Sequence, residues 1–280
     1  MAPIHINAFE SGDFVKTVAA IYIFNSTSKS AYTSLASNYE TFTPGTAEDD
    51  DVIPSMQSFS VFTNATGGSS VTLDYKKLVY DPAIAGVTTD PNFAPRRSIR
   101  DDKPDKMRLY INSENGYGDM LYLLERADFS EGFENGWDGP KLFGESVAPQ
   151  LYAITPDGNM AINCIPTFEG QLLGFRKGTQ DNFYTFMFEY EGENTWYLND
   201  LKEQTSTLIS SESRYMFMAS DEDMAARFVI SRTPIHSTPT GTEQSAISDQ
   251  QSAVKKIVID DKVFIIRNGQ MYHVTGVMVR

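Results

Sequence analysis

The chain has 280 residues, 41% of them hydrophobic and 21% charged, which is enough to bury one large or two medium cores. Its net charge of −14 argues against nucleic acid and anionic lipid as partners, because both attract basic surfaces. The 18 Phe and 14 Tyr favour strands over helices. No apolar run of about 18 residues occurs, so no transmembrane segment is predicted.

Residues 1–80 predict an N-terminal β-sandwich module. The apolar stretch 18–25 is typical of a buried strand, and a short strand is expected near Tyr32. Alternation over 58–63 and the stretch 71–80 predict two more strands. Residues 81–106 contain four prolines and mixed charges, which indicates a connection to the next module.

Residues 107–232 predict a central, jelly-roll-like β-sandwich, because strand-like segments recur about every ten residues. "PQLYAI" and "MAINCI" flank "TPDGN", a pattern that predicts a hairpin with Asp-Gly at the centre of its turn. Within 183–191, alternation places Tyr184, Phe186, Phe188 and Tyr190 on one face. No amphipathic helix longer than two turns is expected.

Residues 233–252 are rich in Ser, Thr, Pro and Gln and predict a flexible linker. Residues 253–280 predict two or three short strands joined at 260–261 and 268–269. This C-terminal β segment is too short to bury a core alone, so it is expected to dock on the rest of the chain or on a partner.

The stretch "GFENGWDGPKLFG" (132–144) permits two interpretations. Its carboxylates and aromatic ring resemble a sugar-binding or hydrolytic site, for which the candidates are Glu134, Trp137, Asp138 and the more distant Trp196. Its glycines and proline are equally typical of a corner between two strands. In that reading Asp138 and Lys141 brace the loop by a hydrogen bond or an ion pair, Trp137 packs at its rim, and Gly132, Phe133 and Gly136 shape it.

Other signals of catalysis are weak. There is no phosphate-binding loop, no dinucleotide fingerprint, and no histidine pair with metal-ligand spacing. Cys164 is expected to be a small buried hydrophobe rather than a nucleophile. The acidic run 48–51 offers oxygen ligands for calcium but lacks the spacing of a compact calcium loop, so a solvated loop is preferred. No cofactor is predicted.

Several phrases resemble a segment of large secreted and surface proteins of Bacteroidetes. In the N-terminal part, Ile53, Pro54, Met56, Gln57, Phe59 and Val61 match an "IPPMQAFFV" pattern. In the central part the match continues in a "gfdngyDa.Klfg…PqLYsi" pattern and its continuation. The residues that fit it are Gly132, Phe133, Asn135, Gly136, Asp138, Lys141, Leu142, Pro149, Leu151, Tyr152, Asn163 and Pro166.

The expected fold is all-β, with tandem antiparallel β-sandwich modules and a short C-terminal β-hairpin segment. This resemblance implies that the sandwiches are jelly-roll-like and come from the C-terminal region of an exported protein. It also implies a type IX secretion sorting signal in 253–280, and a longer polypeptide in which Met1 is internal and the first module lacks its opening strands. The leading hypothesis is a non-enzymatic protein, extracellular or on the outer-membrane surface. Its role would be adhesion, binding of glycan or a host or cell-surface protein, or structure and sorting. The alternative is a polysaccharide-degrading enzyme or accessory module that uses loop carboxylates.

Overall fold

A computed structural model describes residues 4–25, 38–48, 51–53, 56–63, 67–72, 103–223, 225–235, 255–259, 262–267 and 270–273. The strand expected near Tyr32, nearly all of the 81–106 connection and most of the 233–252 linker lie outside these ranges.

The described residues of the N-terminal module form three short antiparallel strand pairs around a small apolar core. β1 (Ile4–His5) pairs with β5 (Val52–Ile53), β2 (Phe14–Val15) with β6 (Ser70–Val71), and β3 (Ile21–Asn25) with β4 (Asn38–Phe42). Two single-turn 3-10 helices, Ile6–Ala8 and Ser11–Asp13, lie between β1 and β2. The core contains Ile6, Phe9, Phe14, Ala19, Ile21, Ala47 and Ile53.

The strand predicted over 58–63 is not formed as a continuous element. Ser60 bridges Tyr22 and Thr63 bridges Thr17, each as an isolated bridge. Both bridges go to the segment 17–22, but Tyr22 lies five positions after Thr17 while Thr63 lies only three after Ser60, so the antiparallel pairing is interrupted and no regular ladder develops. Phe59 and Val61 pack against the core, so the apolar alternation reflects burial of a segment that pairs only irregularly.

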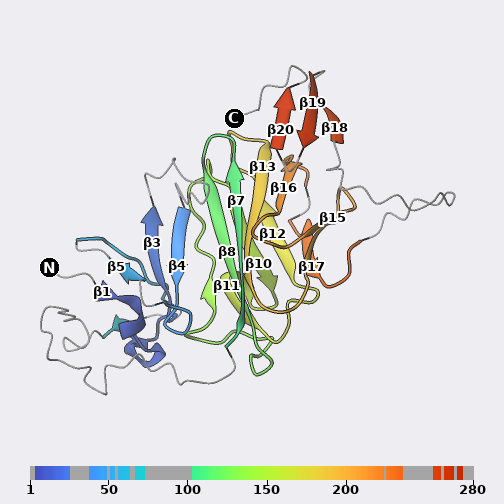
Figure 1. The fold of residues 1–280 in the computed structure, drawn as a ribbon. Helices are drawn as coiled ribbons and strands as arrows, with labels where there is room; N and C mark the ends of the chain where they lie inside the picture. Colours follow the sequence, from blue (N-terminus) through green and yellow to red (C-terminus); the bar gives the residue numbers. More distant parts are fainter. Residues whose placement is uncertain are drawn as a thin grey trace, which may run out of the picture.

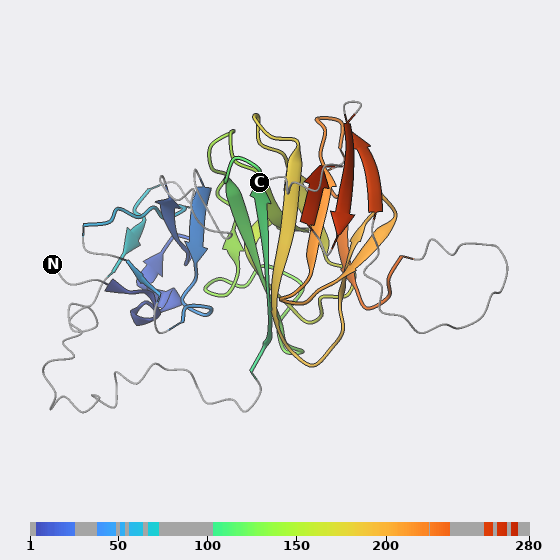
Figure 2. The ribbon, with the colours of Figure 1, turned by 45° about the horizontal axis from the view of Figure 1, so that its top comes forward.

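The central part holds β7 (Asp105–Ser113), β8 (Gly118–Glu125), β9 (Gly139–Pro140), β10 (Gln150–Thr155), β11 (Gly158–Ile165), β12 (Leu172–Arg176), β13 (Phe183–Glu191), β14 (Tyr197–Asp200), β15 (Thr205–Leu208), β16 (Arg214–Met218) and β17 (Phe228–Ser231). They hydrogen-bond in the order β15-β14-β17-β12-β10-β11-β8-β7-β13-β16, with β9 paired to β11 outside this path. Figures 1 and 2 show these strands, green to orange, as one curled body.

The sheet curls far enough for distant strands to face each other. β16 ends the hydrogen-bonded order and β17 lies far from it in that order, yet the rings of Phe217 and Phe228 have centroids 5.0 Å apart. One cluster of buried residues is shared by nine of the strands, from β7 to β17. The all-β, sandwich-like fold class is therefore confirmed.

Local patterns predicted the central strands well. In β13, Tyr184, Phe186 and Phe188 are buried on the core face, as the alternation indicates. β10 and β11 form the expected hairpin, but Thr155 pairs with Gly158, so the central turn residues are Pro156 and Asp157 rather than Asp-Gly. The glycine instead adopts a φ of 126° where β11 begins.

The sheet is not purely antiparallel, which corrects the prediction. β8 and β11 pair in parallel, with Tyr122 opposite Ile162 and Leu124 opposite Cys164. Parallel neighbours need a long crossover between them. Here the crossover contains the 132–144 loop, so this pairing decides where that loop lies.

The C-terminal segment forms a three-stranded antiparallel sheet. β18 (Lys255–Ile259) pairs with β19 (Lys262–Arg267), and β19 with β20 (Gln270–His273). The connections fall at 260–261 and 268–269, as the sequence predicts.

Candidate functional site

The 132–144 loop lies between the outer face of the central sandwich and the N-terminal module. It belongs to the crossover from β8 to β10, and its strand β9 pairs with β11. In Figures 1 and 2 the blue strands β3 and β4 stand beside the green strands that carry this loop. β4 contacts both β8 and β11.

Asp138 fixes the loop to the sandwich through backbone groups. It is 1% exposed, and its Oδ2 accepts the N–H of Glu134 at 2.6 Å while its Oδ1 accepts the N–H of Cys164 in β11 at 2.7 Å. Burial raises the pKa of this carboxyl to about 6, although the two N–H donors oppose the rise. Both oxygens are thus engaged in holding a turn onto a strand.

Lys141 pairs with Asp119 of β8 and not with Asp138. Its Nζ lies 2.7 Å and 2.5 Å from the two carboxylate oxygens, and both side chains are 1% exposed. Asp119 also accepts the N–H groups of Met120 and Leu151. Burial raises the pKa of Asp119, and the Lys141 ammonium and these N–H groups act against that rise.

Trp137 is half-buried at the boundary between the two modules. Its ring packs edge-on against Phe129, with centroids 5.1 Å apart, and its carbonyl accepts the hydroxyl of Thr43 at 3.0 Å. Gly45 donates its N–H to the carbonyl of Gly136 at 2.7 Å. A Cβ on Gly45 would stand 2.6 Å from the Trp137 ring, so the close approach requires glycine there.

Further hydrogen bonds connect the loop and its neighbours to the N-terminal module. Asn135 Oδ1 accepts the N–H of Ala19, and the Tyr22 hydroxyl donates to the carbonyl of Pro140, both at 2.9 Å. Asn38, which is fully buried, donates to the carbonyls of Gly118 and Pro149 and accepts from Gln150. The loop is therefore a docking surface between modules, a role that the sequence does not reveal because these partners are about 80–120 positions apart.

A charged contact reinforces the same interface. Glu48 of the N-terminal module lies 2.8 Å from Lys106 Nζ and 3.1 Å from an Arg108 nitrogen, both in β7. The hydrogen bond with Lys106 and the charge of Arg108 lower the pKa of Glu48. The acidic run 48–51 contributes this ion pair, and its residues 49–50 lie outside the described part.

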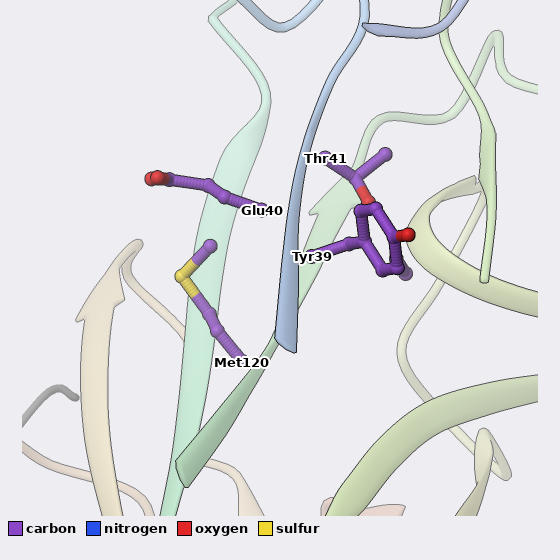
Figure 3. Close-up of a pocket in the computed structure, with 5 residues that line it drawn as sticks. Tyr39, Glu40, Thr41 and Met120 are labelled. Atoms are coloured by element: carbon purple, nitrogen blue, oxygen red, sulfur yellow. The ribbon is translucent and has the colours of Figure 1, made fainter. Parts of the chain in front are cut away.

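A small pocket lies where β4 crosses the central sheet (Figure 3). Tyr39, Glu40 and Thr41 of β4, Met120 of β8 and Ala161 of β11 line it. Glu40 and Met120 point to one side of β4, while Tyr39 and Thr41 point to the other (Figure 3). The space is roughly that of one water molecule, so it is a packing gap at the interface and not a substrate cleft.

The remaining predicted site residues do not converge on one point. Glu134 accepts the N–H of Ser130, and Phe133 donates its N–H to Asp157 at 2.8 Å. Gly132 is exposed. Trp196 is 0% exposed in the sandwich core, where its Nε1 donates to Tyr190 at 3.2 Å, so its ring offers no free face for a sugar.

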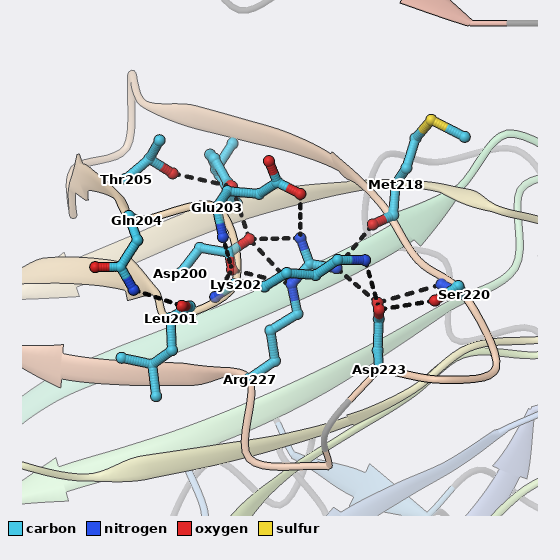
Figure 4. Close-up of polar contacts among 11 residues, drawn as sticks. Asp200, Leu201, Lys202, Glu203, Gln204, Thr205, Met218, Ser220, Asp223 and Arg227 are labelled. Atoms are coloured by element: carbon cyan, nitrogen blue, oxygen red, sulfur yellow. Dashed lines mark hydrogen bonds and ion pairs between the residues drawn. The ribbon is translucent and has the colours of Figure 1, made fainter. Parts of the chain in front are cut away.

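A buried ionic cluster at the other side of the sandwich was not predicted (Figure 4). Arg227, 1% exposed, donates to both oxygens of Asp200 and, at 2.7 Å, to Asp223. The Tyr215 hydroxyl of β16 also donates to Asp200, at 2.8 Å. Lys202, Arg227 and Ser220 hold the pKa of Asp223 down at about 2, against the effect of burial. The cluster ties β14 to β16, the strand at one end of the sheet order.

No family model and no solved structure matches the chain. The chain is similar to the minor fimbrium subunit Mfa5 of Porphyromonas gingivalis, with 29% identity over 231 residues. The match covers 75% of this chain and 18% of the fimbrial protein, so the chain spans less than a fifth of its relative's length.

The described residues contain no group of three or more His, Cys, Asp or Glu side chains arranged to hold a metal ion. Cys164 is buried as a free thiol, and burial raises its pKa well above the ordinary value, which disfavours the nucleophilic thiolate. Within the described ranges, no helix is both long and apolar enough to cross a membrane. The polar groups of the 132–144 loop are arranged to join two modules.

Proposed function

We propose that this chain is a non-enzymatic β-sandwich part of a bacterial cell-surface protein that acts in adhesion or in assembly of surface fibres. The similarity to a fimbrium subunit along 75% of the chain carries the proposal. The structure supports it because Asp138 and Lys141 make internal contacts that stabilise the fold.

Immunogold labelling of intact cells of the source bacterium tests the location, with antibodies raised against residues 103–235. We expect label on the outer surface, in register with any fibres present, and no label on a deletion strain. Label restricted to the cytoplasm of sectioned cells would overturn the proposal.

The ligand is proposed to be a glycan or a host or cell-surface protein, bound by exposed residues of the sandwich. Arrays of glycans and matrix proteins, probed with the purified chain, test this part. Binding that is lost in Trp137→Ala would assign the module boundary as the binding site. The absence of binding to every array member would leave assembly as the function.

The alternative of polysaccharide hydrolysis has no specific observation in its favour. It predicts an activity that disappears in Glu134→Gln and Asp138→Asn, and reducing-sugar release from common polysaccharides measures it. We expect no release by the wild-type protein.

The C-terminal sheet β18–β20 is proposed to serve in export, as the resemblance to type IX sorting signals implies. Deletion of residues 253–280 tests this, with surface amounts measured on intact cells. Unchanged surface amounts would remove the sorting role and leave the location proposal intact.

A further inference from the structure

Two turns meet at one end of the central sandwich. The turn between β7 and β8 carries Glu114 and Asn115, and the loop between β12 and β13 carries Asp181. Asn115 donates its Nδ2 to Asp181 Oδ1 at 2.6 Å, and the Tyr184 hydroxyl donates to the Asp181 carbonyl at 2.8 Å. Asp181 is only 4% exposed, so this contact places a carboxylate below the surface.

The Asp181 carboxylate is incompletely satisfied. Its Oδ2 is buried and has no hydrogen-bond partner. In the part of the chain that the structure describes, Asp181 also has no ion-pair partner, because the nearby Lys177 pairs with Asp221 at 3.3 Å and with Asn182 at 3.2 Å. A buried carboxylate normally is paired or coordinates a metal, since its burial is costly otherwise.

Glu114 directly precedes Asn115, so it belongs to the turn that Asn115 joins to Asp181. Its pKa is raised, first by burial and second by the charge of Asp181, which shows that the two carboxylates sense each other. Glu114 is an exposed residue, so this side of the turn is open to solvent. The arrangement therefore combines one buried and one exposed carboxylate, and among the residues that the structure describes neither forms an ion pair with a cation.

We propose that Glu114 and Asp181 bind a calcium ion that joins the β7–β8 turn to the β12–β13 loop. Calcium takes six to eight oxygen ligands in flexible geometry, so two carboxylates and several waters suit it. Magnesium demands a more regular shell and gives up its water reluctantly, so it should bind more weakly. The proposal stands apart from the proposed function, because it rests on the geometry of these two turns.

Isothermal titration of the chelator-treated full chain with calcium chloride tests the proposal. A dissociation constant on the order of 10⁻⁴–10⁻³ M is expected, as for extracellular calcium modules. At about 10 mM calcium, the unfolding equilibrium constant should then fall by about ten- to a hundredfold, which raises the melting temperature. A wild-type chain whose melting temperature and titration heats do not respond to calcium would overturn the proposal.

Three variants locate the site. Asp181→Asn should abolish the response to calcium, and Glu114→Gln should weaken binding several-fold. Glu193→Gln removes an exposed carboxylate from the turn after β13 and is the matched control, which should respond as the wild type does. A wild-type response in Asp181→Asn overturns the assignment. If Asp181→Asn does not fold, Glu114→Gln provides the test instead, because Glu114 is exposed. A calcium affinity of Glu114→Gln equal to that of the wild type would then overturn the assignment.

Discussion

Buried aspartates hold loops to strands in this molecule by accepting backbone N–H groups. Asp138 does so without a cationic partner, whereas Asp119 and Asp200 also pair with Lys141 and Arg227. Burial raises the pKa of Asp138 to about 6, and it also raises the pKa of Asp119 although Lys141 opposes the rise. In Asp223 of the Arg227 cluster, hydrogen bonds and cations outweigh burial, and the pKa falls to about 2.

The first prediction concerns the pH dependence of stability at Asp138. Its folded pKa of about 6 lies above the unfolded value of 3.8, so the folded state binds the proton more tightly. The stabilisation is complete below about pH 4 and is lost as the pH rises through 6. Relative to Asp138→Asn, the wild type should be more stable at pH 4.5 than at pH 7.5, by about 2 kcal/mol.

Urea denaturation of the wild type and of Asp138→Asn across this pH range measures the difference in their free energies of unfolding. Subtracting one from the other cancels the contributions of the carboxyl groups that both proteins contain. Glu134 and Asp157 contribute to the raised pKa, so Asp157→Asn should shift the midpoint of the difference to lower pH. A difference that is flat between pH 4.5 and 7.5 would contradict the prediction.

The second prediction concerns the buried pair of Lys141 and Asp119. Lys141→Met leaves a carboxylate without its cation at 1% exposure and should lower the free energy of unfolding by about 3–5 kcal/mol. The double variant Asp119→Asn/Lys141→Met removes both charges and should lose less than the single variant. Lys103→Met, an exposed control, should change stability little. Additive losses in the double variant would show that the pair is not coupled.

At the scale of elements, sequence periodicity predicted the strands whose own residues carry a clear local pattern. The alternation in β13 and the turn signals of β10–β11 are local, and the structure has both elements. The short strands β9 and β15 have no such pattern and were missed.

The parallel pairing of β8 with β11 and the docking role of the 132–144 loop depend on contacts between distant segments. No local pattern encodes these contacts. The glycines of the loop were the one signal visible in the sequence. They mark places where the loop closely approaches the N-terminal module, and they do not indicate a catalytic site.

The third prediction tests that close approach. Gly45→Ala places a methyl group 2.6 Å from the Trp137 ring and from the Gly136 carbonyl, so the modules must separate locally. Overpacking of this kind costs about 1–3 kcal/mol. Gly12→Ala is the matched control, because nothing lies within 4 Å of its Cβ position. Hydrogen exchange of 38–48 and 132–144 should accelerate in Gly45→Ala alone, and equal exchange in both variants would refute the clash.

At the scale of the whole molecule, the two modules differ in self-sufficiency. The central sandwich has one large core to which nine strands contribute, whereas the described part of the N-terminal module has three two-stranded pairs and two small clusters of buried residues. Pairs of this size are marginal in isolation. The module also depends on its neighbour for the hydrogen bonds of Asn38 and Thr43. The sandwich is therefore the scaffold, and the module folds on it.

The fourth prediction follows from this asymmetry. A fragment of residues 103–235 should fold cooperatively, because its core is its own, but it should melt below the full chain once the contacts to Trp137 and Gln150 are lost. A fragment of residues 1–102 should lack cooperative unfolding, since its buried Asn38 would have no partners on the sandwich. Thermal denaturation followed by circular dichroism measures both. A cooperative transition in the shorter fragment would show that the module folds independently and that the 132–144 loop merely tethers it.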